Sequence, residues 1–241
     1  YLPAHPGFSQ SDGLEKIDSI YALGFIPQRL ILQKGLPMDY PDPFKAEMFE
    51  RLDDTDDQQF YEMPRKVVHI DEPAIAAVGD FIGTAFAPNG ILLDLMSSWR
   101  SHLPDGFVKQ RLVGLGLNAE EMADNPDLDE YVVHNLNVDP HLPFEDDFFH
   151  GAMVTVSIQY MIKPLEVFAE MCRILKPGAP FAVFFSNRMF PTKAVRVWQV
   201  IRDAGKRELV EKYFQVTDGF EEPIFYDLSP NPGASDPLYV V

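Results

Sequence analysis

The sequence predicts an α/β fold, a three-layer sandwich around a mainly parallel seven-stranded sheet with an antiparallel edge strand. Short apolar runs alternate with stretches whose apolar residues recur at helical spacing, which is typical of right-handed crossovers between parallel strands. The last two apolar runs, residues 224–226 and 238–241, have no helix between them and are expected to pair antiparallel. With 241 residues and 46% hydrophobic content, the chain is long enough for one such domain with additional elements.

The N-terminal quarter of the chain differs from the rest. Residues 1–61 are expected to form a partly irregular arm or lid, and residues 62–241 the main domain. The acidic run at residues 51–57 is typical of a solvated loop. An ordered arm packed on the domain and a mobile lid both remain open, and a partly ordered arm is favoured. Prolines interrupt the region repeatedly: Pro3, Pro6, Pro27, Pro37, Pro41 and Pro43.

A helix is expected over residues 73–86, ahead of the first strand at residues 91–94. Asp71 is a suitable N-cap, and Pro73 suits the first turn of a helix. The segment that follows the strand, residues 97–107, has room for at most two helical turns. The apolar residues of the first helix recur at helical spacing: Ile75, Val78, Phe81, Ile82 and Phe86.

The second strand, residues 111–116, leads into a helix that Asn118 is expected to cap. Glu121 stands three residues later, in the position of a capping box, and the helix ends before Pro126. The remaining elements follow in order: strands at 131–134 and 152–156, a helix over about 165–175, a strand at 181–185, and a helical stretch over about 192–214.

Composition limits the partners of this protein. The chain has 37 acidic and 20 basic residues, a formal net charge of −17, so its field repels nucleic acids and anionic membranes. We therefore expect a small-molecule substrate, no nucleic acid and no membrane partner, and either a monomer or a homodimer. Cys172 is the single cysteine, which excludes an intrachain disulfide and a cysteine-rich metal site. No zinc-binding HExxH pattern is present, and no metal is expected.

The cellular location is predicted to be intracellular and soluble, without a distinction between cytoplasm and organelle stroma. No apolar run reaches the roughly 20 residues that span a bilayer. Because the chain begins at Tyr1 rather than at Met, the lack of a targeting segment carries little weight.

The first strand ends in an acid. Asp94 closes an apolar run and passes directly into small polar residues, as a buried parallel strand does where it delivers groups to the carboxyl edge of the sheet. A functional role beside the crevice of the sheet is favoured for Asp94. The alternative is a carboxylate that only satisfies N–H groups of its own turn.

Three stretches carry a resemblance to a known family, namely residues 91–100, 142–149 and 173–178. They resemble the first motif, the loop before the fourth strand and the turn before the fifth strand of the class I S-adenosylmethionine-dependent methyltransferases, methyltransferase type 11. The resemblance covers about residues 67–241. It implies a Rossmann-like fold, S-adenosyl-L-methionine as cofactor, and an enzyme that transfers a methyl group to an unidentified small molecule. The alternative is a non-catalytic relative that acts as a ligand-binding or scaffold protein.

The sequence departs from the family pattern at three positions. The family turn D-x-G-x-G is replaced by residues 94–98, Asp-Leu-Met-Ser-Ser, although glycines there let the backbone approach the cofactor. Gly116 ends the second strand, where the family carries an acid that binds the ribose. His150 follows Phe149, where the family has aspartate. A dinucleotide oxidoreductase is disfavoured, because no GxGxxG is present.

The resemblance also implies site residues. For some of them a structural role is equally open: Trp99 as a core residue, Asn118 as a helix cap, and Asn135 and Asn137 as turn residues with a side-chain bond to the backbone. The general base is unknown, with His69 and Tyr160 as candidates, and a thiol or carboxylate acceptor needs none. The expected cofactor-binding residues are Asp94, Met96, Ser97, Ser98, Trp99, Asn118, Asn135, Asn137 and Ser157. The expected substrate-binding residues are Tyr61, Arg65, Gln159, Tyr160, Asn187 and Arg188.

Overall fold

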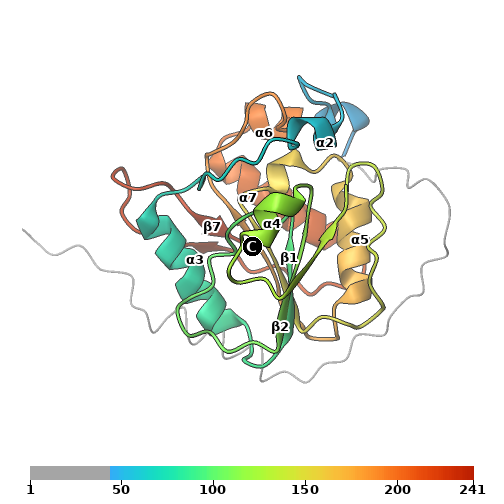
Figure 1. Cartoon of the computed structure of the whole chain (residues 1–241). Coiled ribbons are helices and arrows are strands. Elements are labelled where there is room, and N and C mark those ends of the chain that lie inside the picture. Colours follow the sequence, from blue (N-terminus) through green and yellow to red (C-terminus); the bar gives the residue numbers. More distant parts are fainter. Residues whose placement is uncertain (1–43) are drawn as a thin grey trace, which may run out of the picture.

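The computed structural model describes residues 44–241, which form a seven-stranded sheet with helices on both faces (Figure 1). The strand order is β3-β2-β1-β4-β5-β7-β6; β1 to β5 are parallel, and β7 is antiparallel to both β5 and β6. The predicted fold class and the antiparallel pairing of the last two strands are confirmed. The strands are β1 Ile91–Leu95, β2 Arg111–Gly116, β3 Glu130–Val133, β4 Gly151–Thr155, β5 Phe181–Phe185, β6 Tyr226–Asp227 and β7 Tyr239–Val240.

The helices divide between the two faces. Helix α3 lies on one face, and α5, α6 and α7 cover the other (Figure 1). Side chains of β1 alternate accordingly, because Leu92 packs in the α3 cluster whereas Leu93 and Leu95 pack in the cluster of α5 and α7. The helices are η1 Ala46–Phe49, α2 Asp57–Phe60, α3 Glu72–Ala85, α4 Ala119–Ala123, η2 Ile158–Tyr160, α5 Pro164–Ile174, α6 Arg196–Val200 and α7 Asp203–Val216.

Local signals in the sequence set the helix starts. The side chain of Asp71 accepts a hydrogen bond from the N–H of Ala74 at 3.1 Å, and Asn118 accepts one from the N–H of Glu121 at 2.9 Å. Both predicted N-caps are confirmed. The helical stretch predicted over 192–214 is two helices, α6 and α7, with a break at Ile201 and Arg202.

The connection between β1 and β2 contains no helix. Residues 96–110, all of which the structure describes, run from one strand to the next as turns and irregular chain. The two helical turns that the sequence allowed there do not form. The carboxyl end of β1 is therefore followed by a compact loop instead of a helix N-terminus.

The described part of the N-terminal arm packs on the main domain. Phe44 and Phe49 are buried in the cluster of α5 and α7, and the rings of Phe44 and Tyr213 lie 5.5 Å apart. The prediction for the arm before residue 44 lies outside the described residues. No helix in the described part of the chain is long and apolar enough to cross a membrane.

Candidate functional site

Asp94 is held by the loop that follows it. The side chain is 3% exposed, and its Oδ2 accepts hydrogen bonds from the hydroxyls of Ser97 at 2.6 Å and Ser101 at 2.7 Å. Asn125, behind the loop, donates to the Ser101 hydroxyl and to the Ser98 carbonyl, both at 2.9 Å. Side-chain hydroxyls of the loop therefore orient the carboxylate of Asp94.

The same loop closes over the end of β2. The N–H of Ser97 donates to the Leu115 carbonyl at 2.8 Å, which continues the bonding between β1 and β2 past the end of β1. A Cβ on residue 116 would lie 2.2 Å from the Ser97 carbonyl oxygen, so only glycine fits there. To make this turn, Met96 adopts a left-handed φ of 61°, which is uncommon for a residue other than glycine. The acid that the family carries at this position is missing because the loop backbone occupies its space.

Burial raises the pKa of Asp94 to about 6 from its ordinary value of 3.8. The hydroxyls of Ser97 and Ser101 oppose the rise, and the charge of Asp127 adds to it. The folded state therefore binds this proton more tightly than the unfolded state does.

This shift predicts a pH dependence of stability. Because the folded-state pKa lies above the unfolded-state value, the unfolding free energy should fall as pH rises from about 4 to about 6. The side chain of Asp94→Asn does not titrate, so this variant should lack that fall in unfolding free energy. The fall amounts to roughly 3 kcal/mol, at about 1.4 kcal/mol per pKa unit. Urea denaturation of both proteins between pH 4 and 7 measures it, with the exposed Asp105→Asn as control. Parallel curves for the parent protein and Asp94→Asn would contradict the assignment.

A segment that begins where the arm ends crosses the carboxyl edge of the sheet over this loop. We call residues 61–70 the strap. Its backbone is bound from below by Asn118, whose Nδ2 donates to the carbonyls of Tyr61 at 2.7 Å and Glu62 at 3.2 Å. Asn118 therefore both caps α4 and holds the strap.

Two further bonds fix the middle of the strap. The N–H of Arg65 donates to Glu121 Oε1 at 2.5 Å, while Glu121 Oε2 accepts from the Ser98 hydroxyl at 2.5 Å. The indole N–H of Trp99 donates to the Val67 carbonyl at 3.0 Å. Glu121 is 6% exposed and binds the strap instead of its own helix N-terminus, so the capping box expected from the sequence is only half formed.

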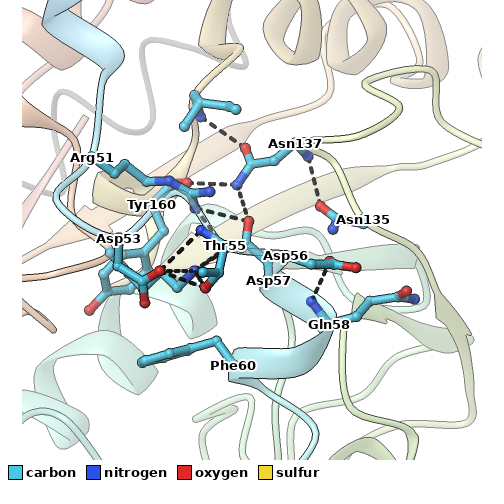
Figure 2. Close-up of polar contacts among 12 residues, drawn as sticks. Arg51, Asp53, Thr55, Asp56, Asp57, Gln58, Phe60, Asn135, Asn137 and Tyr160 are labelled. Atoms are coloured by element: carbon cyan, nitrogen blue, oxygen red, sulfur yellow. Dashed lines mark hydrogen bonds and ion pairs between the residues drawn. The ribbon is translucent and has the colours of Figure 1, made fainter.

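A buried ion network anchors the chain just before the strap (Figure 2). Asp57, 4% exposed, accepts from Arg51 at 2.7 and 2.9 Å and from Asn137 Nδ2 at 2.8 Å, and its Oδ1 lies 3.2 Å from Lys193 Nζ. Lys193 is fully buried and donates to the Thr55 carbonyl at 2.7 Å. The solvated loop predicted for residues 51–57 is thus wrong for Asp57. A buried carboxylate is stable there because two cations and an amide compensate its charge.

The other end of the strap is tied to the loop before β7. The N–H of Asp71 donates to Asp236 Oδ2 at 3.0 Å, and the N–H of Asp236 donates to Asp71 Oδ2 at 2.9 Å. Arg188, after β5, pairs with Asp236 Oδ1 at 2.6 Å. The strap is therefore fixed at both ends, at its start by Asn118, and held in its middle by the side chains of Glu121 and Trp99.

Two hollows border the strap. The inner cavity, about 60 Å³, lies against Asp94, and the outer cleft, about 450 Å³, is open. The strap residues 67–69 line both. The inner cavity is also lined by Asp94, Met96, Ser97, Ser98, Trp99, Arg100, His102, Thr155 and Val156. The outer cleft is also lined by Ile70, Asp71, Arg188, Met189, Phe190 and Asp236.

The sequence-predicted site residues fall into separate groups. Asp94, Met96, Ser97, Ser98 and Trp99 meet at the inner cavity. His69 lines both hollows, and Arg188 lines the outer cleft.

Predicted residues that follow β2 and β3 bind the arm: Asn118 binds the Tyr61 carbonyl, and Asn137 binds Asp57. Asn135 Oδ1 accepts from the N–H of Asn137 at 3.0 Å, which confirms the turn alternative. The Asn137 side chain binds Asp57 and the Tyr160 carbonyl. Arg65 places its guanidinium 4.0 Å from the ring centre of Phe60.

The predicted residues after β4 and β5 are mostly engaged inside the fold. Gln159, 1% exposed, donates to the carbonyls of Val156 and Arg188. The Tyr160 hydroxyl accepts from the N–H of Phe190 at 2.7 Å, and burial raises the pKa of Tyr160. The Ser157 hydroxyl is buried without a partner in the described chain, and Asn187 accepts a long bond of 3.5 Å from Ser186.

Several site residues escaped the sequence reasoning. Thr155 lines the inner cavity, and its buried hydroxyl has no hydrogen-bond partner within residues 44–241. Its position at the end of β4, beside β1, was the available signal. Glu121 and Asp236 carried no such signal in the sequence. Glu121 binds the strap and Asp236 binds Arg188, and both partners are far away along the chain.

The two histidines near the inner cavity are uncharged at neutral pH. Burial lowers the pKa of His69, and burial, Arg100 and His69 lower the pKa of His102 to about 4. No group of three or more histidine, cysteine or acidic side chains among the described residues is arranged to hold a metal.

Part of the chain is similar to known proteins. Residues 106–183 match the family model of a methyltransferase domain, type 11. The biotin biosynthesis bifunctional protein BioHC of Teredinibacter turnerae is 32% identical over 82 residues, which are 33% of this chain and 14% of that protein. The match thus spans a small part of that relative's length.

The solved structures that resemble the chain are more distant in sequence. The PH0226 protein from Pyrococcus horikoshii OT3 is 18% identical, with a TM-score of 0.47 over 69% of this chain and 87% of that chain. An S-adenosylmethionine-dependent methyltransferase from Mesorhizobium loti is 13% identical, with a TM-score of 0.44 over 64% of this chain and 90% of that chain. The resemblance seen in the sequence is confirmed by the family match: residues 106–183 of this chain are a match to the methyltransferase domain, type 11.

Proposed function

We propose that this protein transfers a methyl group from S-adenosyl-L-methionine to a small molecule. The observation that carries the proposal is the position of the inner cavity. It lies at the carboxyl ends of β1 and β4, where the strand order reverses and open α/β sheets bind their ligands. The methyltransferase match contains β2, β3, β4 and the first residues of β5. Asp94 on β1 and the unpartnered Thr155 hydroxyl on β4 face that cavity.

The cofactor fits this site only when the strap is displaced. Small-molecule pockets measure about 300–1,000 Å³, and the inner cavity offers about 60 Å³. Asn118, Glu121 and Trp99 supply the polar groups that a nucleoside needs, an amide, a carboxylate and an indole N–H, and all three now bind strap backbone. We infer that the strap closes the site and that the cofactor takes over these groups when it opens.

The chain's own residues would then position the reactants. Asp94, Ser97 and Ser98, which line the inner cavity, would hold and orient the donor. The cofactor, when bound, supplies an activated methyl group, and the protein orients it toward an acceptor. Among the two candidate bases His69 is better suited than Tyr160, whose hydroxyl is engaged by Phe190 and whose pKa burial raises.

Titration calorimetry of the full chain with S-adenosylhomocysteine tests this proposal. We expect saturable one-to-one binding, together with a rise in melting temperature, because a ligand that binds the folded state stabilises it. Asp94→Ala should abolish binding, whereas the exposed Asp105→Ala should not. No heat and no thermal shift, in the parent chain and in the strap-opening variant described in the Discussion, would overturn it.

A second function is supported by the loop after β1. The Ser97 carbonyl lies against Gly116, and Met96 lines the inner cavity, so side chains and backbone fill space that a cofactor turn normally leaves open. A non-catalytic relative that binds another ligand or acts as a scaffold is consistent with this filling. Absence of S-adenosylhomocysteine binding after the strap has opened would favour that function.

A further inference from the structure

We propose that strand β3 is the contact through which two copies of this chain form a dimer. This strand, Glu130–Val133, lies at one edge of the sheet, and among residues 44–241 it pairs with β2 alone. Every second residue of an edge strand points its N–H and C=O groups away from the sheet, where a further strand can bind them. A dimer of this kind does not depend on the proposed methyl transfer.

Large apolar side chains are exposed at this edge. Tyr131 and Val133 are 41% and 44% exposed, and because they alternate along the strand they lie on the same face of the sheet. Val138, which follows the strand, is 70% exposed. Burial of these side chains against a second apolar surface is favourable.

The acids at this edge are compensated, although the chain as a whole is strongly acidic. A formal net charge of −17 opposes the association of two copies. Beside β3, however, Asp129 Oδ2 lies 2.6 Å from Lys109 Nζ of the segment that leads into β2. Likewise, Glu130 Oε1 lies 3.1 Å from Arg111 Nη1. The repulsion between two copies is therefore offset locally where their β3 strands would meet.

The direction of the backbone bonds fixes the register of the dimer. The N–H of His134 donates to the Gly116 carbonyl at 2.9 Å, and in a parallel ladder this orientation recurs at every second residue. Tyr131 and Val133 therefore point their N–H and C=O groups away from β2. With a two-fold axis at Val132 and antiparallel strands, Tyr131 of each copy faces the partner's Val133. Each of these two pairs exchanges both of its N–H···O=C bonds.

This register is self-complementary, as a two-fold contact between identical chains requires. An aromatic side chain packs on a β-branched one across the strands, a combination that stabilises antiparallel pairs. No acid faces an acid, because Glu130 lies opposite the partner's His134 and Asp129 lies opposite the partner's Asn135. A second copy of this chain therefore fits the edge. Because β3 has four residues, we expect a small interface and a reversible dimer.

Sedimentation velocity of the full chain, between about 1 and 200 µM, tests the dimer. We expect a shift from the mass of one chain, 27.3 kDa, to that of two, with a Kd on the order of 10 µM. Val133→Glu places a charge against the partner's Tyr131 and should weaken the dimer at least about tenfold. Val200→Glu, at a position on α6 that is 73% exposed, should leave it unchanged. A single chain at every concentration, or a dimer that both variants affect equally, overturns the proposed contact.

Disulfide cross-linking tests the register. In a Cys172→Ser background, which removes the single cysteine, Val132→Cys places two thiols on the two-fold axis. Residues of such a non-hydrogen-bonded pair have Cα atoms about 4.5 Å apart, within the range that a disulfide bridges. We expect mild oxidation at about 20 µM to yield a covalent dimer of Val132→Cys but not of the exposed Val200→Cys. Equal cross-linking of the two variants, or none in Val132→Cys, overturns the pairing of β3 with its copy.

Discussion

Arg65→Pro should bind S-adenosylhomocysteine about tenfold more tightly than the parent chain. Proline has no N–H, so the substitution removes the strap donor to Glu121 and leaves a carboxylate that is 6% exposed without that partner. An unsatisfied buried acceptor costs about 1–3 kcal/mol, and this cost falls only on the closed state. The open state becomes more populated, and the apparent affinity of a ligand that needs the open state rises in proportion. Calorimetry of both proteins measures the change.

The matched control is Arg65→Ala. It keeps the N–H that binds Glu121 and loses only the side chain, whose guanidinium lies over Phe60. Its affinity for S-adenosylhomocysteine should stay near that of the parent chain. Hydrogen exchange of residues 61–70 reports the strap itself, and it should accelerate in Arg65→Pro alone.

Two outcomes separate the strap from the cofactor. Exchange that is equal in all three proteins would contradict the strap as a closing segment. Faster exchange in Arg65→Pro without any binding of S-adenosylhomocysteine would support the strap as a closing segment and contradict the proposed cofactor. In that case the alternative function, a non-catalytic ligand-binding or scaffold protein, is favoured.

Gly116→Ala should lower the free energy of unfolding by roughly 3 kcal/mol. Its Cβ would lie 2.2 Å from the Ser97 carbonyl oxygen and 3.1 Å from the Met122 sulfur, and the first contact is with backbone that the bonds of Asp94 hold in place. Urea denaturation followed by circular dichroism measures the loss. Gly83→Ala is the control, because its Cβ would meet only Pro104 at 3.4 Å and alanine favours the helix.

Gly116→Asp extends this prediction to the site. It restores the acid that the family carries after the second strand, yet the carboxylate cannot enter because the Ser97 carbonyl occupies its space. We expect a larger loss of stability than in Gly116→Ala and no gain in affinity for S-adenosylhomocysteine. A stable Gly116→Asp protein with tighter binding would contradict the closed loop between β1 and β2.

Local patterns in the sequence were sufficient for most of the fold. The apolar runs of β2 and β5 were placed with their observed bounds, and the caps at Asp71 and Asn118 were found because a capping bond spans only three residues. The loop between β1 and β2 was harder. Its length allowed two helical turns, and the bonds from Ser97 and Ser101 to Asp94 hold it in another conformation.

The candidate site was predicted less completely than the fold. Asp94 and the residues after it were placed at the inner cavity, because the end of a parallel strand is visible in the sequence. Asn137 was correctly placed at the carboxyl edge of the sheet, but its side chain binds Asp57 of the arm. Thr155 was missed, since a single hydroxyl at a strand end carries no pattern of its own.

The sequence by itself determined the order of strands and helices, the acid that ends β1 and the resemblance to methyltransferases. Those properties depend on residues near one another along the chain. Tertiary structure alone decided what closes the site. Lys193 reaches Thr55, 138 residues away, and Glu121 binds Arg65 across 56 residues. Whether a charge is buried or solvated depends on a partner that only folding brings to it, and no local pattern records that partner.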